Sequence, residues 1–63
     1  MMLKEEAQVA IVREWLALPT SARATQYQAF LFAIDARQRF RFRCGGDPHQ
    51  YIMGWLGPHI GSG

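Results

Sequence analysis

Four arginines at alternating positions are the residues of this chain whose types and spacing best suit binding chemistry. They are Arg37, Arg39, Arg41 and Arg43, in the stretch RQRFRFRC. A guanidinium group can hold a phosphate or a carboxylate through two parallel hydrogen bonds. The row therefore predicts an acidic binding partner, which is either a protein with an acidic surface or a nucleic acid.

Two phenylalanines, Phe40 and Phe42, lie between the last three of these arginines. In a helix the two rings would point about 160° apart, and no coherent face would result. In an extended chain both rings lie on one side and the arginines on the other. We therefore expect residues 39–43 to be extended. Such a segment can pair with its equivalent in a second copy, add to the sheet of another protein, or form a solvated connection with its rings packed beneath the first helix.

Phe32 is a second candidate for partner binding. On a helix it shares a face with Gln28, Asp35 and Arg39, so an aromatic ring is expected on a polar side. An exposed aromatic ring is typical of the residues that dominate protein interfaces. The alternative is that the C-terminal segment covers this face.

A thiol, a carboxylate and an imidazole occur within six residues, at Cys44, Asp47 and His49. A chain of this size has little room for a substrate pocket, and Asp47 before Pro48 is typical of a helix start, so we predict no catalytic residue and no enzyme. Cys44, His49 and His59 match no zinc spacing and lack a fourth ligand. Neither a metal nor a cofactor is expected.

The first element that must position these residues is a helix from about Leu3 to Leu18, ended by Pro19. One apolar stripe at helical spacing is expected to face the core. It consists of Ala7, Ile11, Trp15 and Leu18. A second stripe lies beside the first and adds more apolar surface than a helix on a small core needs. It consists of Val9, Val12 and Leu16.

A second helix is expected to begin early, at Thr20 or Ser21, or late, at Thr25. Its apolar residues follow the spacing i, i+3, i+4 and i+7, which predicts a core-facing stripe. They are Tyr27, Phe30, Leu31 and Ile34. Between them, Ala29, Ala33 and Ala36 would allow another helix to approach closely.

A third, short helix is expected to begin at Asp47 and Pro48 and to end at Gly57 and Pro58. Its apolar residues are Tyr51, Ile52, Trp55 and Leu56. A glycine inside a helix costs about 1 kcal/mol relative to alanine, so Gly54 is expected to permit a close contact.

The predicted fold class is therefore mostly α: a small three-helix domain over residues 1–60, with a short extended segment between helices two and three and a flexible tail at 61–63. The single cysteine excludes an internal disulfide and fits a reducing compartment, and no apolar run is long enough to span a membrane. We therefore expect a cytoplasmic protein. Hydrophobic residues form 49% of the chain, a surplus that predicts self-association as a homo-oligomer.

The charge distribution supports the expectation of an acidic partner. The net charge is only +2, but residues 23–43 carry five arginines against one acid, Asp35. Together these features predict a non-enzymatic small regulator or inhibitor, of the kind that phages and mobile elements carry, which acts by binding another protein. The alternative hypothesis is a nucleic-acid-binding protein that uses the arginine block 37–43.

Overall fold

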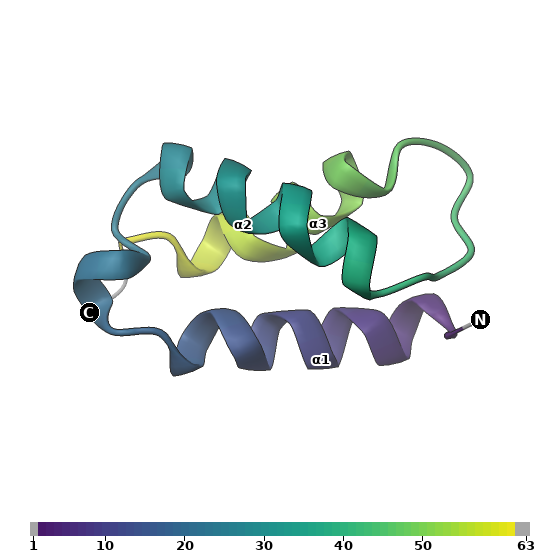
Figure 1. Cartoon of the computed structure of the whole chain (residues 1–63), viewed down its shortest axis with the longest axis horizontal. Coiled ribbons are helices and arrows are strands. Elements are labelled where there is room, and N and C mark those ends of the chain that lie inside the picture. The colour runs from purple at the N-terminus through teal and green to yellow at the C-terminus, as the bar shows by residue number, and fades with distance from the viewer. Residues whose placement is uncertain (1, 62–63) are drawn as a thin grey trace.

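The computed structural model describes residues 2–61, and three α-helices form its framework (Figure 1). Helix α1 spans Lys4–Ala17, α2 spans Gln26–Arg39 and α3 spans Pro48–Leu56. Two short 3₁₀ turns, η1 and η2, follow the first and third helices, at Thr20–Ala22 and Gly57–His59. The predicted mostly α, three-helix fold class is confirmed.

The chain runs back and forth along one long direction. Helix α2 runs opposite to α1, and α3 runs opposite to α2 (Figure 1). Helix α3 packs against both of the other helices. No helix within residues 2–61 is long and apolar enough to cross a membrane. Near the C-terminus, the N–H of Gly61 donates to the carbonyl of Arg23 over 3.0 Å. This bond joins part of the expected tail to the loop before α2. Residues 1, 62 and 63 lie outside the described residues.

The start of α2 is fixed by a reciprocal pair of side-chain hydrogen bonds. The hydroxyl of Thr25 accepts from the N–H of Gln28 over 3.1 Å, and the amide oxygen of Gln28 accepts from the N–H of Thr25 over 3.0 Å. Each bond satisfies a backbone donor that the first turn of a helix leaves without a partner. Of the two expected starts, the late one at Thr25 is therefore the one that forms.

Trp15 is fully buried and links three parts of the chain. Its indole N–H donates to the carbonyl of His59 over 3.2 Å, and the edge of Phe32 meets its ring at a centroid distance of 5.3 Å. The buried hydrophobic residues are Ala7, Ile11, Trp15, Ala29, Ala33, Ala36, Phe42, Ile52 and Leu56. The predicted core stripe of the first helix is thus confirmed for Ala7, Ile11 and Trp15.

The predicted core stripe of the second helix is wrong. Its four residues are exposed by 70%, 46%, 48% and 38%, and they are Tyr27, Phe30, Leu31 and Ile34. The buried face of α2 carries alanines instead, at 29, 33 and 36. At about 100° per residue, this alanine face lies nearly opposite the larger apolar stripe. Small side chains let helix axes approach closely, and this packing leaves the large side chains outside.

The connection between α2 and α3 is extended, as predicted, but it begins at Phe40, because Arg39 is still the last residue of α2. The N–H of Met2 donates to the carbonyl of Arg41 over 2.8 Å, within an isolated parallel bridge between Met2 and Phe42. Phe42 is buried and lies 5.2 Å from the ring of Trp55. The segment is therefore a connector whose one backbone pairing partner comes from the same chain, and residues 2–61 contain no β-strand.

The alanine face generates a stability prediction. Replacing Ala33 with leucine should lower the free energy of unfolding by about 1–3 kcal/mol, because the extra atoms must fit into a closely packed helix contact. Gln38→Leu adds the same side chain on the exposed part of α2 and should change stability by no more than about 0.5 kcal/mol. Urea unfolding followed by circular dichroism measures both. Equal effects of the two substitutions would contradict the observed orientation of α2.

Candidate protein-binding surfaces

Arg39 is held by two carboxylates and is not available as a free binding group. Its guanidinium lies 2.9 Å from the carboxylate of Glu14 on α1 and 2.6 Å from that of Asp35 on α2. The hydrogen bonds with Glu14, and then those with Asp35, raise the pKa of Arg39 above its already high ordinary value. The predicted site residue Arg39 therefore connects α1 to α2 across the surface.

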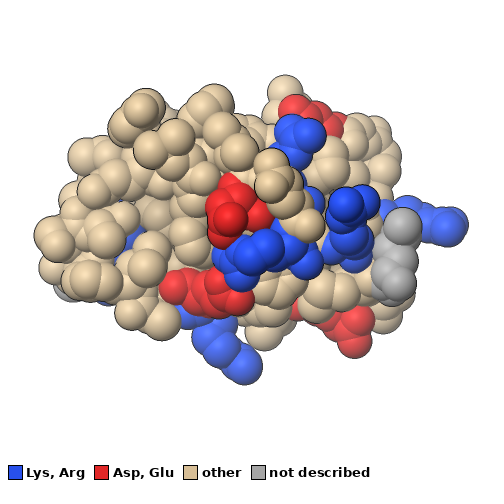
Figure 2. Space-filling model, viewed as in Figure 1, with Lys and Arg blue, Asp and Glu red and all other residues tan. Residues whose placement is uncertain are grey.

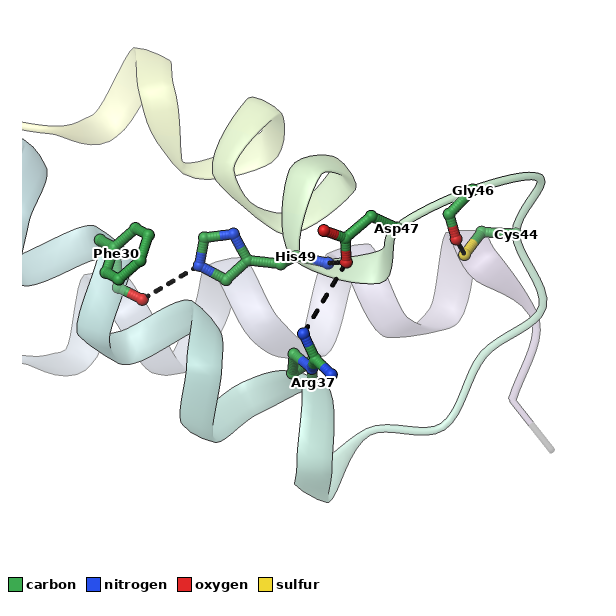
Figure 3. Close-up of polar contacts among 6 residues, drawn as sticks. All are labelled: Phe30, Arg37, Cys44, Gly46, Asp47 and His49. Carbon is green, nitrogen blue, oxygen red and sulfur yellow. Dashed lines mark hydrogen bonds and ion pairs between the residues drawn. The ribbon is translucent and has the colours of Figure 1, made fainter.

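The other three arginines of the predicted row differ in their surroundings. Arg37 lies 3.8 Å from the carboxylate of Asp47, with both side chains half exposed (Figure 3). Arg41 and Arg43 are exposed on either side of the buried Phe42, as the alternating pattern predicts, and neither forms an ion pair within residues 2–61. Acidic side chains lie among the basic ones on the face shown in Figure 2, which lowers the local positive potential.

Phe32, the predicted aromatic anchor, is half-buried, because its ring meets Trp15 edge to face. The side of α2 that carries Phe32 therefore faces inward, and the ring of Phe32 packs against the core. The exposed aromatic rings of α2 are those of Tyr27 and Phe30.

The thiol, carboxylate and imidazole near α3 have separate structural roles (Figure 3). The carboxylate of Asp47 accepts from the N–H of His49 over 3.0 Å, which confirms Asp47 as the helix cap. The Nε2 atom of His49 lies 3.2 Å from the carbonyl of Phe30, and because a carbonyl only accepts, Nε2 carries the proton. The thiol of Cys44 donates to the carbonyl of Gly46 over 3.2 Å. The imidazole ring points toward α2 and away from the thiol, so the three groups do not converge.

Residues 2–61 contain no group of three or more histidine, cysteine, aspartate or glutamate side chains that is arranged to hold a metal ion. Of the two histidines considered as ligands in the sequence, His49 directs its ring toward the carbonyl of Phe30 on α2.

An open, mostly apolar groove lies between α1 and the C-terminal part of the chain, and we refer to it as the α1–α3 groove. Its volume is about 780 Å³. It is lined by Gln8, Val9, Val12, Arg13, Leu16, Ala17, Gly54, Trp55, Pro58 and His59. The surplus apolar stripe predicted on the first helix thus forms one wall. The predicted close contact at Gly54 is wrong, because a methyl group there would meet no atom within 4 Å.

A second apolar surface, the α2 stripe, consists of Tyr27, Phe30, Leu31 and Ile34. The part of the surface over the N-terminal half of α2, at the upper left of Figure 2, shows no charged side chain. Phe30 borders α3, because its ring lies 4.7 Å from that of His49. The spacing predicted this stripe as core, whereas the three alanines that were expected to let another helix approach closely are the residues that are buried.

Comparison with known proteins gives no relative: no protein-family model, no curated protein and no solved structure matches this chain. The two apolar surfaces and the exposed arginines are therefore the features of this chain that suggest a function.

The cap of α3 generates a second stability prediction. Asp47→Ala should lower the free energy of unfolding by about 1 kcal/mol, because the N–H of His49 loses its acceptor. Asp47→Asn keeps an acceptor oxygen while it removes the charge that faces Arg37, so it should cost only a few tenths of a kcal/mol. Urea unfolding measures both. If the asparagine variant is as unstable as the alanine variant, the ion pair matters more than the cap.

Proposed function

We propose that this protein is a non-enzymatic regulator or inhibitor that acts by binding another protein in the α1–α3 groove. The observation that supports this best is the exposure of Val9 and Leu16, by 58% and 41%, in the wall opposite Trp55. Removing branched apolar side chains from water against a partner lowers the free energy of the complex. Exposed apolar patches that line a concavity are typical of protein-binding sites.

The groove suits an amphipathic helix of the partner. It follows α1 from Gln8 to Ala17, and the nine steps of 1.5 Å between these two residues give a length of about 14 Å. A helix that binds through apolar residues at i, i+3 or i+4 and i+7 spans about 10 Å between its first and last anchors. Val9, Val12 and Leu16 have this spacing, so they can interdigitate with such anchors.

The charges near the groove favour a partner helix with acidic residues on its polar side. Arg13 is exposed in the groove lining, and Arg41 and Arg43 add exposed positive charge elsewhere on the domain. Glu5 and Glu6 share a smaller hollow with Val9 and Arg13, so the acidic residues of the partner are expected on the Leu16 side of Arg13, away from these two acids. Complementary charges of this kind set the orientation and the association rate more than the affinity.

The first test places charge in the groove. A photo-crosslinking amino acid at Val12 identifies the bound protein in cells, and the purified partner is then titrated calorimetrically against variants. Val9→Glu with Leu16→Glu should weaken binding at least tenfold, because two carboxylates would be buried against apolar side chains. Both residues are exposed, so helical content should be unchanged.

Leu31→Glu is the control, since it places one such charge on an exposed leucine of α2, outside the groove lining. Equal losses for the groove variant and the control would contradict binding in the groove. Anisotropy titration of labelled single-stranded DNA and RNA tests the alternative hypothesis. Salt-sensitive binding that is lost in Arg41→Gln with Arg43→Gln would support nucleic-acid binding in place of the proposal.

Gly54 allows stability and binding to be separated. Gly54→Ala should raise the free energy of unfolding by up to about 1 kcal/mol, because the helix interior gains a better helix former and the methyl group meets no neighbour. The same methyl group adds to the groove lining, so the affinity for the crosslinked partner should fall. Thermal unfolding and calorimetry measure the two effects. A variant that is both more stable and as tightly bound would show that the partner does not reach the α3 wall.

A further inference from the structure

We propose that the α2 stripe binds a second copy of the same chain, so that two α2 helices pack antiparallel across a two-fold axis. This proposal concerns a different surface from the α1–α3 groove, and the two surfaces share no residue. It leaves both grooves of the dimer open to a partner. The spacing of the stripe, the positions of the charges on α2 and the amount of exposed apolar surface support such a pair.

The spacing of the stripe is symmetric about its own centre, between residues 30 and 31. In an antiparallel pair centred there, Tyr27 of one copy lies opposite Ile34 of the other, and Phe30 lies opposite Leu31. Each apolar residue therefore has an apolar counterpart. This self-complementarity is what a two-fold interface requires, because the same patch must serve both partners.

The charges on α2 favour the antiparallel arrangement over the parallel one. All three of its charged residues, Asp35, Arg37 and Arg39, lie in the last five positions of the helix. A parallel pair would place Arg37 beside its own copy, and like charges in such contact repel. In the antiparallel pair, Asp35 lies opposite Gln26, and no charged residue within the two helices faces another.

The exposed area is sufficient for a small interface. Two aromatic and two aliphatic side chains at these exposures present about 450 Å² per copy, or about 900 Å² for the pair. Neighbouring polar residues of α2, such as Gln26 and Gln38, add a rim. With this rim the total approaches the roughly 1,000–1,200 Å² at the lower end of specific protein interfaces, which suits a weak, reversible dimer.

The shape of the surface also favours a second copy. The α2 stripe is the outside of a single helix, which packs readily against an equal helix at an axis distance of about 8–10 Å. The other apolar surface of this chain, the α1–α3 groove, could receive the stripe of a neighbouring copy. That contact would join two different surfaces, and unless its rotation closed a ring it would continue into chains of molecules.

Sedimentation velocity of the purified full chain between about 5 and 500 µM tests the proposal. We expect a reversible monomer–dimer equilibrium with no larger species, because a two-fold contact closes on itself. Leu31→Glu should weaken dimerisation at least tenfold, while Val9→Glu with Leu16→Glu should leave it unchanged. Circular dichroism checks that Leu31→Glu keeps its helical content.

Cysteine crosslinking tests the orientation in a Cys44→Ser background. An equal mixture of Tyr27→Cys and Ile34→Cys chains should form a disulfide between the two variants, because positions 27 and 34 lie opposite one another. Each variant alone should crosslink much less, since identical positions are separated along the axis by seven residues, or about 10 Å.

Each other result would overturn the proposal. A strict monomer at 500 µM would exclude self-association through this surface. Species that grow beyond a dimer, and that the groove variant abolishes, would show contact of the stripe with the groove. Efficient crosslinking of each single variant with itself would show a parallel pair. Because all of these measurements use the purified chain alone, they are independent of whether a foreign partner binds the groove.

Discussion

The burial of Trp15 is the constraint on which the other contacts of this small domain depend. An indole ring can be buried fully only when its N–H finds an acceptor, and here the carbonyl of His59 provides one. That bond brings the C-terminal segment back to α1. The edge-to-face contact with Phe32 joins α2 to the same ring. Once Phe32 faces Trp15, the rotation of α2 is set, its alanine face turns toward the core and the larger apolar residues must face outward.

The features of this fold that could be predicted from the sequence are those that depend on residues close together in the chain. Helix starts depend on residues three positions apart, such as Thr25 with Gln28, so caps and helix limits are predictable locally. The buried face of α2 is different, because it depends on what the neighbouring helices supply. A hydrophobicity pattern ranks Phe30 and Leu31 above Ala33, whereas close packing of α2 against α3 favours the smaller residue. The residues that were wrongly predicted as the α2 core therefore form the α2 stripe, an apolar surface that this chain alone leaves exposed.

The candidate site was predictable only in part, for a related reason. Alternation correctly predicts that Arg41 and Arg43 are exposed while Phe42 is buried, since a period of two is a property of the local backbone. It does not show that Arg39 meets Glu14, which is 25 positions away in the chain. A row of arginines in the sequence thus separates into one residue that links two helices, one beside a helix cap and two that form no ion pair within residues 2–61. The apolar groove, built from two distant segments, has no local signal apart from the surplus stripe on the first helix.

The composition of the core gives a physical reason why binding and folding should be coupled. Of the nine buried hydrophobic residues within residues 2–61, four are alanines, which contribute little apolar area each. A 63-residue chain already buries a smaller share of its surface than larger domains do. Large apolar side chains such as Tyr27 and Val9 are meanwhile exposed. Any partner that covers them binds the folded state alone and stabilises it by mass action. A partner or a second copy that covered these side chains would therefore add to the stability that the small core supplies.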